Sequence, residues 1–284
     1  MIIYLYAGLA QLVEQLIYTE KVTGSSPVSR TMVDLSNRII YEDEDILALN
    51  KPAGIVVHSD GRTTEPSVSE WLVRKYPEAK NVGEMIRLEG GLNPDGSMTE
   101  GKIIDRSGIV HRLDRETSGV LLLAKTQKGF EHLKNLFLKR KIKKTYYAFV
   151  YGNMKEDHGT LSMSIGKSPS DFRKYSAGRG ATGEMRDAVT YFRVLKKGEG
   201  FSLIEAKPKT GRTHQIRVHF QSLQRPVVGD KLYASTKPSL LGFKRLALHA
   251  REVTFKDLNG VEQTIKADFP EDFLEAFKEI GYKA

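Results

Sequence analysis

Residues 110–124 read VHRLDRETSGVLLLA, a charged stretch that leads directly into a continuous apolar run. The run from Gly119 to Ala124 is short and apolar throughout, which is typical of a buried strand. Asp114 therefore lies on a loop between Arg112 and Arg115, just before a rigid part of the core, where folds often present reactive groups. Neighbouring cations would keep its carboxylate ionised. From this motif alone, a salt-bridged structural aspartate is favoured over a catalytic one.

The segments on either side of this run predict many strands and few helices. Strands are expected at 38–50 as a hairpin, at 119–124, 145–151, 188–196 and 201–207, and at 246–256 and 263–267 around Asn259-Gly260, with extended chain at 54–58. Helices are expected at 67–76, 128–141, 213–223 and 272–280. Residues 82–106 are interpreted as a surface loop or insertion, and 155–183 as short strands with a mobile loop. This pattern indicates an α+β fold with a mixed, largely antiparallel sheet.

The composition is that of an ordinary globular chain of 284 residues, with 40% apolar and 28% charged residues. No window of about 18 apolar residues is present, so no membrane-spanning helix and no membrane partner are expected. Cysteine is absent, which excludes disulfides and thiolate chemistry and favours a cytoplasmic location. The net charge of +9 and pI of about 9.4 suggest a polyanionic partner, although a basic protein without such a partner remains an alternative.

Residues 1–31 differ in character from the rest of the chain. The strings GLAQLVEQ and KVTGSSPVSRTM back-translate naturally to the arms of a transfer-RNA gene, and they carry no clear signal-peptide pattern. A short amphipathic helix is a second interpretation of the first residues. We therefore expect 1–31 to be a non-domain extension with a mis-assigned start at Met1, and 32–284 to be the catalytic domain. The intact mass of the native protein tests this hypothesis.

Two further clusters combine basic residues with other functional side chains. In KPKTGRTHQIRVH (207–219), Thr213 is a plausible helix N-cap beside a basic turn, a favourable setting for phosphate. On this helix His214, Arg217 and Gln221 would share one polar face; a solvated arginine is the alternative. In LKRKIKKTYYAFVYG (138–152), basic residues precede two tyrosines, as suits an unpaired nucleic-acid strand, although by alternation at least one tyrosine must pack in the sheet.

Several familiar constellations are missing from the sequence. We find no Walker loop, no dinucleotide glycine fingerprint and no nucleophile elbow. His214 and His219 are five residues apart, unlike the four-residue spacing of zinc helices. The turn KPAG at 51–54, with His58, suggests no chemistry of its own and is interpreted as structural. No metal and no cofactor are therefore expected.

Six ordered blocks together resemble the RluA-type family of RNA pseudouridine synthases, in the form without an S4 domain. The blocks are IYEDEDILALNKPAGIVVH, GIVHRLDRETSGVLLLAKT, KTYYAFVYG, PKTGRTHQIRVHF, RPVVGDKLY and LALHA, and they extend from about Ile39 to Phe255. The resemblance implies the pseudouridine synthase fold, a curved, mostly antiparallel sheet in two halves with a central active-site cleft. It also implies an isomerase that needs no metal or cofactor and acts as a monomer on ribosomal or transfer RNA.

The resemblance also assigns roles to residues. Asp114 takes the position of the essential catalytic carboxylate, and Arg217 that of the arginine that pairs with this carboxylate. Tyr146 takes the position of the tyrosine that stacks on the target base, with help in removing the C5 proton as a further role that the resemblance leaves open. Arg112 corresponds to the arginine that fills the space left by the flipped base. Further RNA contacts are expected from the flanking basic and polar residues: His111, Arg115, Thr117, Lys143, Lys144, Arg212 and His214. Attack of Asp114 on the sugar or the uracil, and proton abstraction from the sugar, all remain open as routes.

Overall fold

The computed structural model describes residues 32–59, 65–84, 86–88, 102–104 and 106–283. The predictions for residues 1–31 lie outside this range. The strands are β1 (Ile39–Glu42), β2 (Ile46–Lys51), β3 (Ile86–Leu88), β4 (Lys102–Ile104), β5 (Ser118–Ala124), β6 (Lys143–Tyr151), β7 (His158–Ser162), β8 (Ile165–Lys167), β9 (Tyr175–Ala177), β10 (Thr182–Arg186), β11 (Val189–Gly198), β12 (Phe201–Pro208), β13 (Leu248–Lys256) and β14 (Glu262–Lys266). The α-helices are α2 (Val68–Lys75), α3 (Gln127–Leu138), α4 (Gln215–Ser222) and α5 (Glu271–Glu279), with short 3-10 helices at Ser36–Arg38, Pro77–Asn81 and Gly178–Gly180.

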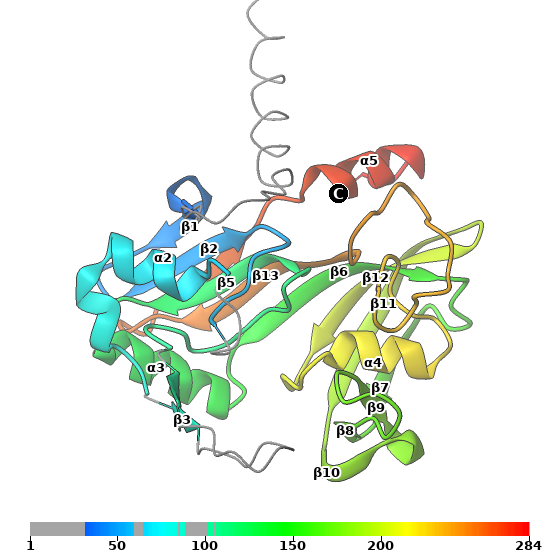
Figure 1. The fold of residues 1–284 in the computed structure, drawn as a ribbon. Helices are drawn as coiled ribbons and strands as arrows, with labels where there is room; N and C mark the ends of the chain where they lie inside the picture. Colours follow the sequence, from blue (N-terminus) through cyan, green and yellow to red (C-terminus); the bar gives the residue numbers. More distant parts are fainter. Residues whose placement is uncertain (1–31, 60–64, 85, 89–101, 105, 284) are drawn as a thin grey trace, which may run out of the picture. The chain divides into compact units, whose positions relative to one another are not determined.

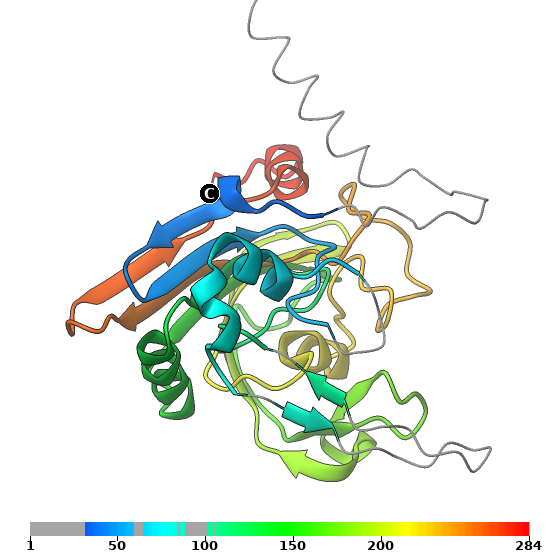
Figure 2. The ribbon, with the colours of Figure 1, turned by 60° about the vertical axis from the view of Figure 1, so that its left-hand side comes forward.

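One nine-stranded sheet forms the centre of the fold in the part of the chain that the structure describes (Figures 1 and 2). Its order is β1-β2-β5-β13-β6-β12-β11-β7, and β14 pairs with β13. All of these pairs are antiparallel except β5 with β13, which is parallel. A smaller sheet, β10-β8-β9, is built from residues 165–186. The α+β class and the mixed, mostly antiparallel sheet predicted from the sequence are confirmed.

The stretches 46–49 of β2 and 120–124 of β5 are apolar throughout because both faces of these strands are covered. Leu47 and Leu49 of β2 pack in one cluster with Trp71 and Leu72 of α2. The alternate β2 residue Ile46 belongs to a second cluster that contains Leu133 and Leu136 of α3. A strand that is buried on both faces has no solvent side and therefore no polar alternation. The buried position of β5 fixes the end of the loop that carries Asp114.

The other half of the sheet has its own core, built around β6 and β12. Phe149 of β6 is fully buried and contacts Phe201 of β12 and Phe273 of α5, with ring centroids 5.9 and 5.7 Å apart. Phe220 of α4 joins the same cluster. Helix α4 therefore belongs to this half, whereas the loop that carries Asp114 belongs to the other. A site built from both must lie where the two halves meet.

Three details of the predicted elements are corrected by the structure. The helix expected at 213–223 begins at Gln215, because His214 takes the N-cap position in a left-handed conformation; Thr213 is not the cap. The connection between β13 and β14 spans residues 257–261, where Asp257 accepts hydrogen bonds from the Asn259 and Val261 amides. Within 82–106, β3 and β4 form an antiparallel pair, and residues 85, 89–101 and 105 lie outside the described range.

Gly119, at the start of β5, allows a close approach between strands that no other residue permits. Its φ is +112°, and a Cβ there would lie 2.2 Å from the Ala250 carbonyl oxygen of β13. Gly119→Ala is therefore expected to lower the free energy of unfolding by about 3 kcal/mol, combining strained φ with overpacking. Gly200→Ala is the control, because Gly200 also has positive φ (+75°) but open space around it, so its loss should be about 1 kcal/mol. Urea unfolding of both variants measures this difference, and equal losses would contradict the steric explanation.

Candidate active site

A buried lysine holds the loop that carries Asp114 in place. The ammonium of Lys51 is fully buried at the end of β2 and donates to the carbonyls of Pro52, Ile55 and Arg115, at 2.8, 2.9 and 3.0 Å. The Gly54 amide donates to the same Arg115 carbonyl at 2.9 Å. Burial lowers the pKa of Lys51 to about 7. The KPAG turn is thus structural, as predicted, and it anchors the loop one residue after Asp114.

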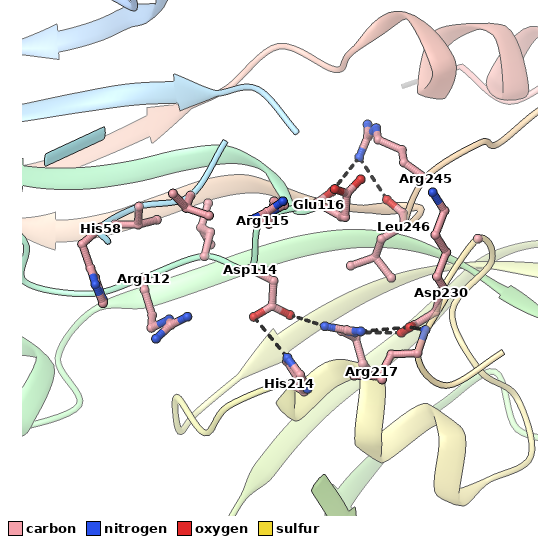
Figure 3. Close-up of a pocket in the computed structure, with 16 residues that line it drawn as sticks. His58, Arg112, Asp114, Arg115, Glu116, His214, Arg217, Asp230, Arg245 and Leu246 are labelled. Atoms are coloured by element: carbon pink, nitrogen blue, oxygen red, sulfur yellow. Dashed lines mark hydrogen bonds and ion pairs between the residues drawn. The ribbon is translucent and has the colours of Figure 1, made fainter. Parts of the chain in front are cut away.

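Asp114 makes its principal contact with a helix from the other half of the sheet. Its Oδ2 accepts a 2.8 Å hydrogen bond from Nη1 of Arg217, which lies on α4 (Figure 3). The rest of the guanidinium is engaged by Asp230: Nε and Nη2 donate to its two carboxylate oxygens at 2.7 and 2.9 Å. The Asp230 side chain is 0% exposed. Arg217 is therefore clamped from one side by a buried carboxylate and presents its remaining Nη1 to Asp114.

The Asp114 carboxyl stays ionised in this setting. Burial acts to raise its pKa, but the nearby His214 imidazole and the charged, hydrogen-bonded Arg217 guanidinium outweigh that effect, so the pKa lies below its usual range. Burial also lowers the pKa of His214, which leaves its imidazole neutral at pH 7 and makes Arg217 the main compensating charge. The expectation that cations keep Asp114 ionised is supported, but the decisive arginine is not a sequence neighbour. Arg115 instead pairs with Glu65.

A cavity of about 370 Å³ opens beside the carboxylate, a volume within the range of small-ligand sites. Its wall includes His58, Arg112, His214 and Arg245 together with Asp114 (Figure 3). Several cationic or imidazole groups thus surround the Asp114 carboxylate in a cavity that Glu116 and Asp230 also line, a setting suited to a polyanionic substrate.

Tyr146 lies near this cavity but is not among the residues that line it. It is half-buried on β6, opposite Ala250 of β13, and its ring packs against the apolar clusters of both halves. Burial and the charge of Asp114 both raise the pKa of its phenol well above the ordinary value. The tyrosine is therefore a neutral phenol at physiological pH. Its neighbour Tyr147 packs in the sheet against Phe269.

The residues predicted to contact RNA are not all accessible. Thr117 is 2% exposed, and His111 packs against Phe137 while its Nε2 accepts a 2.9 Å hydrogen bond from the Leu122 amide. Burial lowers the pKa of His111 to about 3, so the ring is neutral. Both residues support the loop and β5 from inside. The prediction that they touch RNA is not supported.

The predicted basic contacts lie closer to the surface. Arg112 is exposed and, within the described residues, its guanidinium has no hydrogen-bond or ion-pair partner. Lys143 is exposed and lies 3.7 Å from Glu262. Lys144 and Arg212 are half-buried and donate to the Thr210 and Asp187 carbonyls, at 3.4 and 3.1 Å.

Three residues of the site were not identified from the sequence. Asp230 and Tyr233 lie in the RPVVGDKLY block, which was quoted for the family resemblance without a role. Arg245 donates to the Glu116 carbonyl at 3.2 Å and pairs with Asp272 of α5 at 2.7 Å. The only sequence signal for Asp230 was an acidic residue directly after Gly229, and nothing in the neighbouring sequence indicated that Arg217 is its partner.

Within the described residues, no helix is long and apolar enough to cross a membrane. The same part of the chain holds no group of three or more His, Cys, Asp or Glu side chains that could bind a metal ion together.

Comparisons with known proteins show which family the sequence is similar to. The family model described as RNA pseudouridylate synthase matches residues 45–222. An uncharacterized RNA pseudouridine synthase of Bacillus subtilis, YlyB, is 33% identical over 85% of this chain and 72% of its own length. A counterpart from Synechocystis is also 33% identical, over 83% of this chain, which spans only 66% of that relative. The ribosomal large subunit pseudouridine synthase D of Xanthomonas campestris is 31% identical over 88% of this chain and 72% of its own length.

Solved structures show the same fold. The structure of human RNA pseudouridylate synthase domain containing 4 has a TM-score of 0.65 at 23% identity and covers 88% of this chain and 95% of its own. Human RNA pseudouridylate synthase domain containing 1 has a TM-score of 0.61 at 24% identity, with 88% and 87% coverage. At these identities the likeness concerns the architecture of the sheet.

Proposed function

Because the chain belongs to the RNA pseudouridylate synthase family, a family of isomerases, we propose that it converts specific uridines of RNA to pseudouridine through a mechanism that depends on Asp114. The observation that carries the proposal is the ionised Asp114 carboxylate beside the cavity, with Oδ2 held by Arg217 and with no hydrogen bond to Oδ1 from the residues that the structure describes. The family resemblance drawn from the sequence blocks is confirmed by the family match and the relatives.

The reaction needs a group of this kind. The N1–C1′ glycosidic bond of the uridine breaks, a C5–C1′ bond forms, the C5 proton leaves and N1 gains a proton, so the product is an isomer of the substrate. An ionised carboxylate serves either as a nucleophile toward the nucleoside or as a base toward its sugar. Oδ1 of Asp114 is the oxygen placed for this step, because Oδ2 is already bound to Arg217.

The target uridine must leave the RNA stack to reach Asp114, which costs a few kcal/mol. We propose that Arg112 takes the place of the flipped base, since its exposed guanidinium lines the cavity and has no partner in the described part of the chain. We propose that Tyr146 receives the uracil by stacking. The place of Tyr146 in the KTYYAFVYG block supports this role, and the raised pKa of its phenol argues against a phenolate that accepts the C5 proton.

The names of relatives suggest the class of RNA. Two relatives carry the name ribosomal large subunit pseudouridine synthase D, which favours large-subunit ribosomal RNA, with transfer RNA as the second candidate. Exposed Lys143 and half-buried Lys144 and Arg212 would contact the phosphates around the target.

The experiment is pseudouridine mapping of total RNA from cells with and without this gene. We expect one or a few uridines to remain unmodified without it and to be restored by the intact gene but not by an Asp114→Asn copy. The affected molecule identifies the substrate as ribosomal or transfer RNA. Unchanged pseudouridine at every position would overturn the proposed function.

A further inference from the structure

His214 has an unusual backbone conformation at the edge of the active site. Its φ of +54° and ψ of +21° are left-handed, a conformation that is sterically unfavourable for a residue other than glycine. Strain of this kind tends to persist where the surrounding structure requires a particular side-chain position. The conformation places the imidazole between Tyr233 and Asp114: Nδ1 lies 2.9 Å from the Tyr233 hydroxyl, and Nε2 lies 3.9 Å from Oδ1 of Asp114.

The hydrogen-bond network around Tyr233 determines which imidazole nitrogen carries the proton. The Tyr233 hydroxyl accepts a 2.9 Å hydrogen bond from the Tyr175 amide of β9, so its own hydrogen is available to Nδ1 of His214. With the proton on Nδ1 instead, the Tyr233 hydrogen would have no acceptor among the described residues. A lone pair of Nε2 would then also face the Asp114 carboxylate. The network therefore favours the neutral imidazole with its proton on Nε2.

We propose that His214 is a positioning residue for Asp114, held by Tyr233 with its Nε2–H directed at the carboxylate oxygen that Arg217 leaves free. This inference rests on the proposed function of Asp114 and adds to it the protonation state and the supporting residue. The 3.9 Å separation is longer than a hydrogen bond, and such contacts commonly shorten when substrate is bound. His214 thus limits the positions that Oδ1 can adopt. It is assigned here to Asp114, in place of the RNA contact expected from the sequence.

The charges around His214 agree with a neutral ring. Burial lowers its pKa most; Asp114 and Asp230 raise it, Arg217 and Arg112 lower it, and the net direction is downward. Among the described residues, the phenols of Tyr233 and Tyr175 also face it, and their rings meet the imidazole edge to face at 5.6 and 5.8 Å. Protonation of Nδ1 in acid would displace the Tyr233 hydroxyl hydrogen and remove this arrangement.

The support reaches into the small sheet. Ile165 of β8 and Val218 of α4 share a buried cluster, against which Tyr175 and Tyr233 pack. The amide of Tyr175, which donates to the Tyr233 hydroxyl, lies within the segment 155–183, where the sequence predicted short strands. The position of β9 and the state of His214 are coupled through one hydroxyl group.

Two substitutions at His214 separate positioning from packing. His214→Gln keeps an N–H donor at about the position of Nε2, whereas His214→Asn suits the left-handed backbone better but ends short of Asp114. We expect His214→Asn to lower the single-turnover rate about 10- to 100-fold and His214→Gln to stay within about threefold of wild type, with unchanged RNA affinity. Equal losses in the two variants would overturn the positioning role.

Nuclear magnetic resonance tests the protonation state without any activity. In ¹⁵N-labelled full-length protein at pH 7.5, imidazole ¹H–¹⁵N correlations should show His214 with the proton on Nε2, with the assignment taken from the signals lost in His214→Asn. Tyr233→Phe should give a mixture of the two neutral forms. The control Tyr191→Phe, at an exposed tyrosine of β11, should leave the His214 signals unchanged. A wild-type His214 protonated on Nδ1 or on both nitrogens would overturn the inference, even if pseudouridine formation is confirmed.

Discussion

Asp114→Asn is expected to lower pseudouridine formation by at least about 10⁴-fold, the scale on which enzymes respond to loss of their reactive group. Asparagine keeps the shape of the side chain and an oxygen that accepts from Arg217, but it cannot attack the nucleoside or take its proton. RNA affinity should stay within about threefold of wild type, because the phosphate contacts come from other residues. Release of tritium from RNA labelled at uridine C5 measures the reaction, and filter binding measures the affinity.

The matched control for this substitution is Asp268→Asn, because the side chain of Asp268 is fully exposed and its nearest cation, Arg251, is 3.9 Å away. We expect it to react at the wild-type rate. Asp114→Ala should be as inactive as Asp114→Asn but less stable, since it leaves Nη1 of Arg217 without this acceptor. If either variant retained more than about one hundredth of the wild-type rate, Asp114 would not be the reactive group.

Local sequence patterns were sufficient where local physics decides the structure. The all-apolar run of β5 predicted a strand buried on both faces, and Ser67 forms the capping box at the start of the predicted helix α2. These features depend on hydrophobic period and on hydrogen bonds between residues three or four apart. The same reasoning placed Asp114 correctly on a loop at the mouth of a core strand.

What the local patterns missed are contacts between segments remote in sequence. The arginines beside Asp114 in sequence do not bind it: Arg112 has no partner in the described part of the chain, and Arg115 pairs with Glu65. The hydrogen bond comes from Arg217, 103 residues away, and only the family resemblance predicted it. Thr213 was favoured as an N-cap by residue type, but the interactions of His214 with Tyr233 and Asp114 accompany a different helix start.

Arg217→Met is expected to lower the rate at pH 7 by about 10³-fold and to make the remaining rate strongly pH-dependent. In the wild-type protein the lowered pKa keeps Asp114 ionised from pH 5 to 9, so the rate should not follow its titration there. Without the guanidinium, burial is the dominant influence and raises the pKa of Asp114. The carboxylate is then lost as the pH falls, and the rate of the variant should decrease from pH 8 toward pH 5.

Arg217→Lys separates charge from geometry in this site. Lysine keeps a cation near Asp114 but cannot bind Asp230 with two parallel hydrogen bonds while also reaching Asp114. Its rate should therefore fall without a new pH dependence in the range from 5 to 9. A steep acid limb in Arg217→Lys, or none in Arg217→Met, would contradict the assignment of Arg217 as the charge that keeps Asp114 ionised. Arg193→Met, at an exposed arginine of β11, is the control and should behave as wild type.

Arg217→Met should also lower the free energy of unfolding, because Arg217 pairs with both Asp114 and Asp230. Arg217→Met leaves Asp230 buried without its counterion and is expected to cost about 3–5 kcal/mol in urea unfolding at pH 7. A depressed carboxyl pKa stabilises the fold above the unfolded-state value of about 3.9, and this contribution is lost as the pH falls through the lower folded-state value. The wild-type protein should therefore lose the Asp114 contribution only below about pH 4. Arg217→Met lacks this Asp114 contribution already at neutral pH, so the difference in unfolding free energy between the wild type and the variant should shrink in acid. A difference that stays constant with pH would argue that the Arg217–Asp114 ion pair does not cause it.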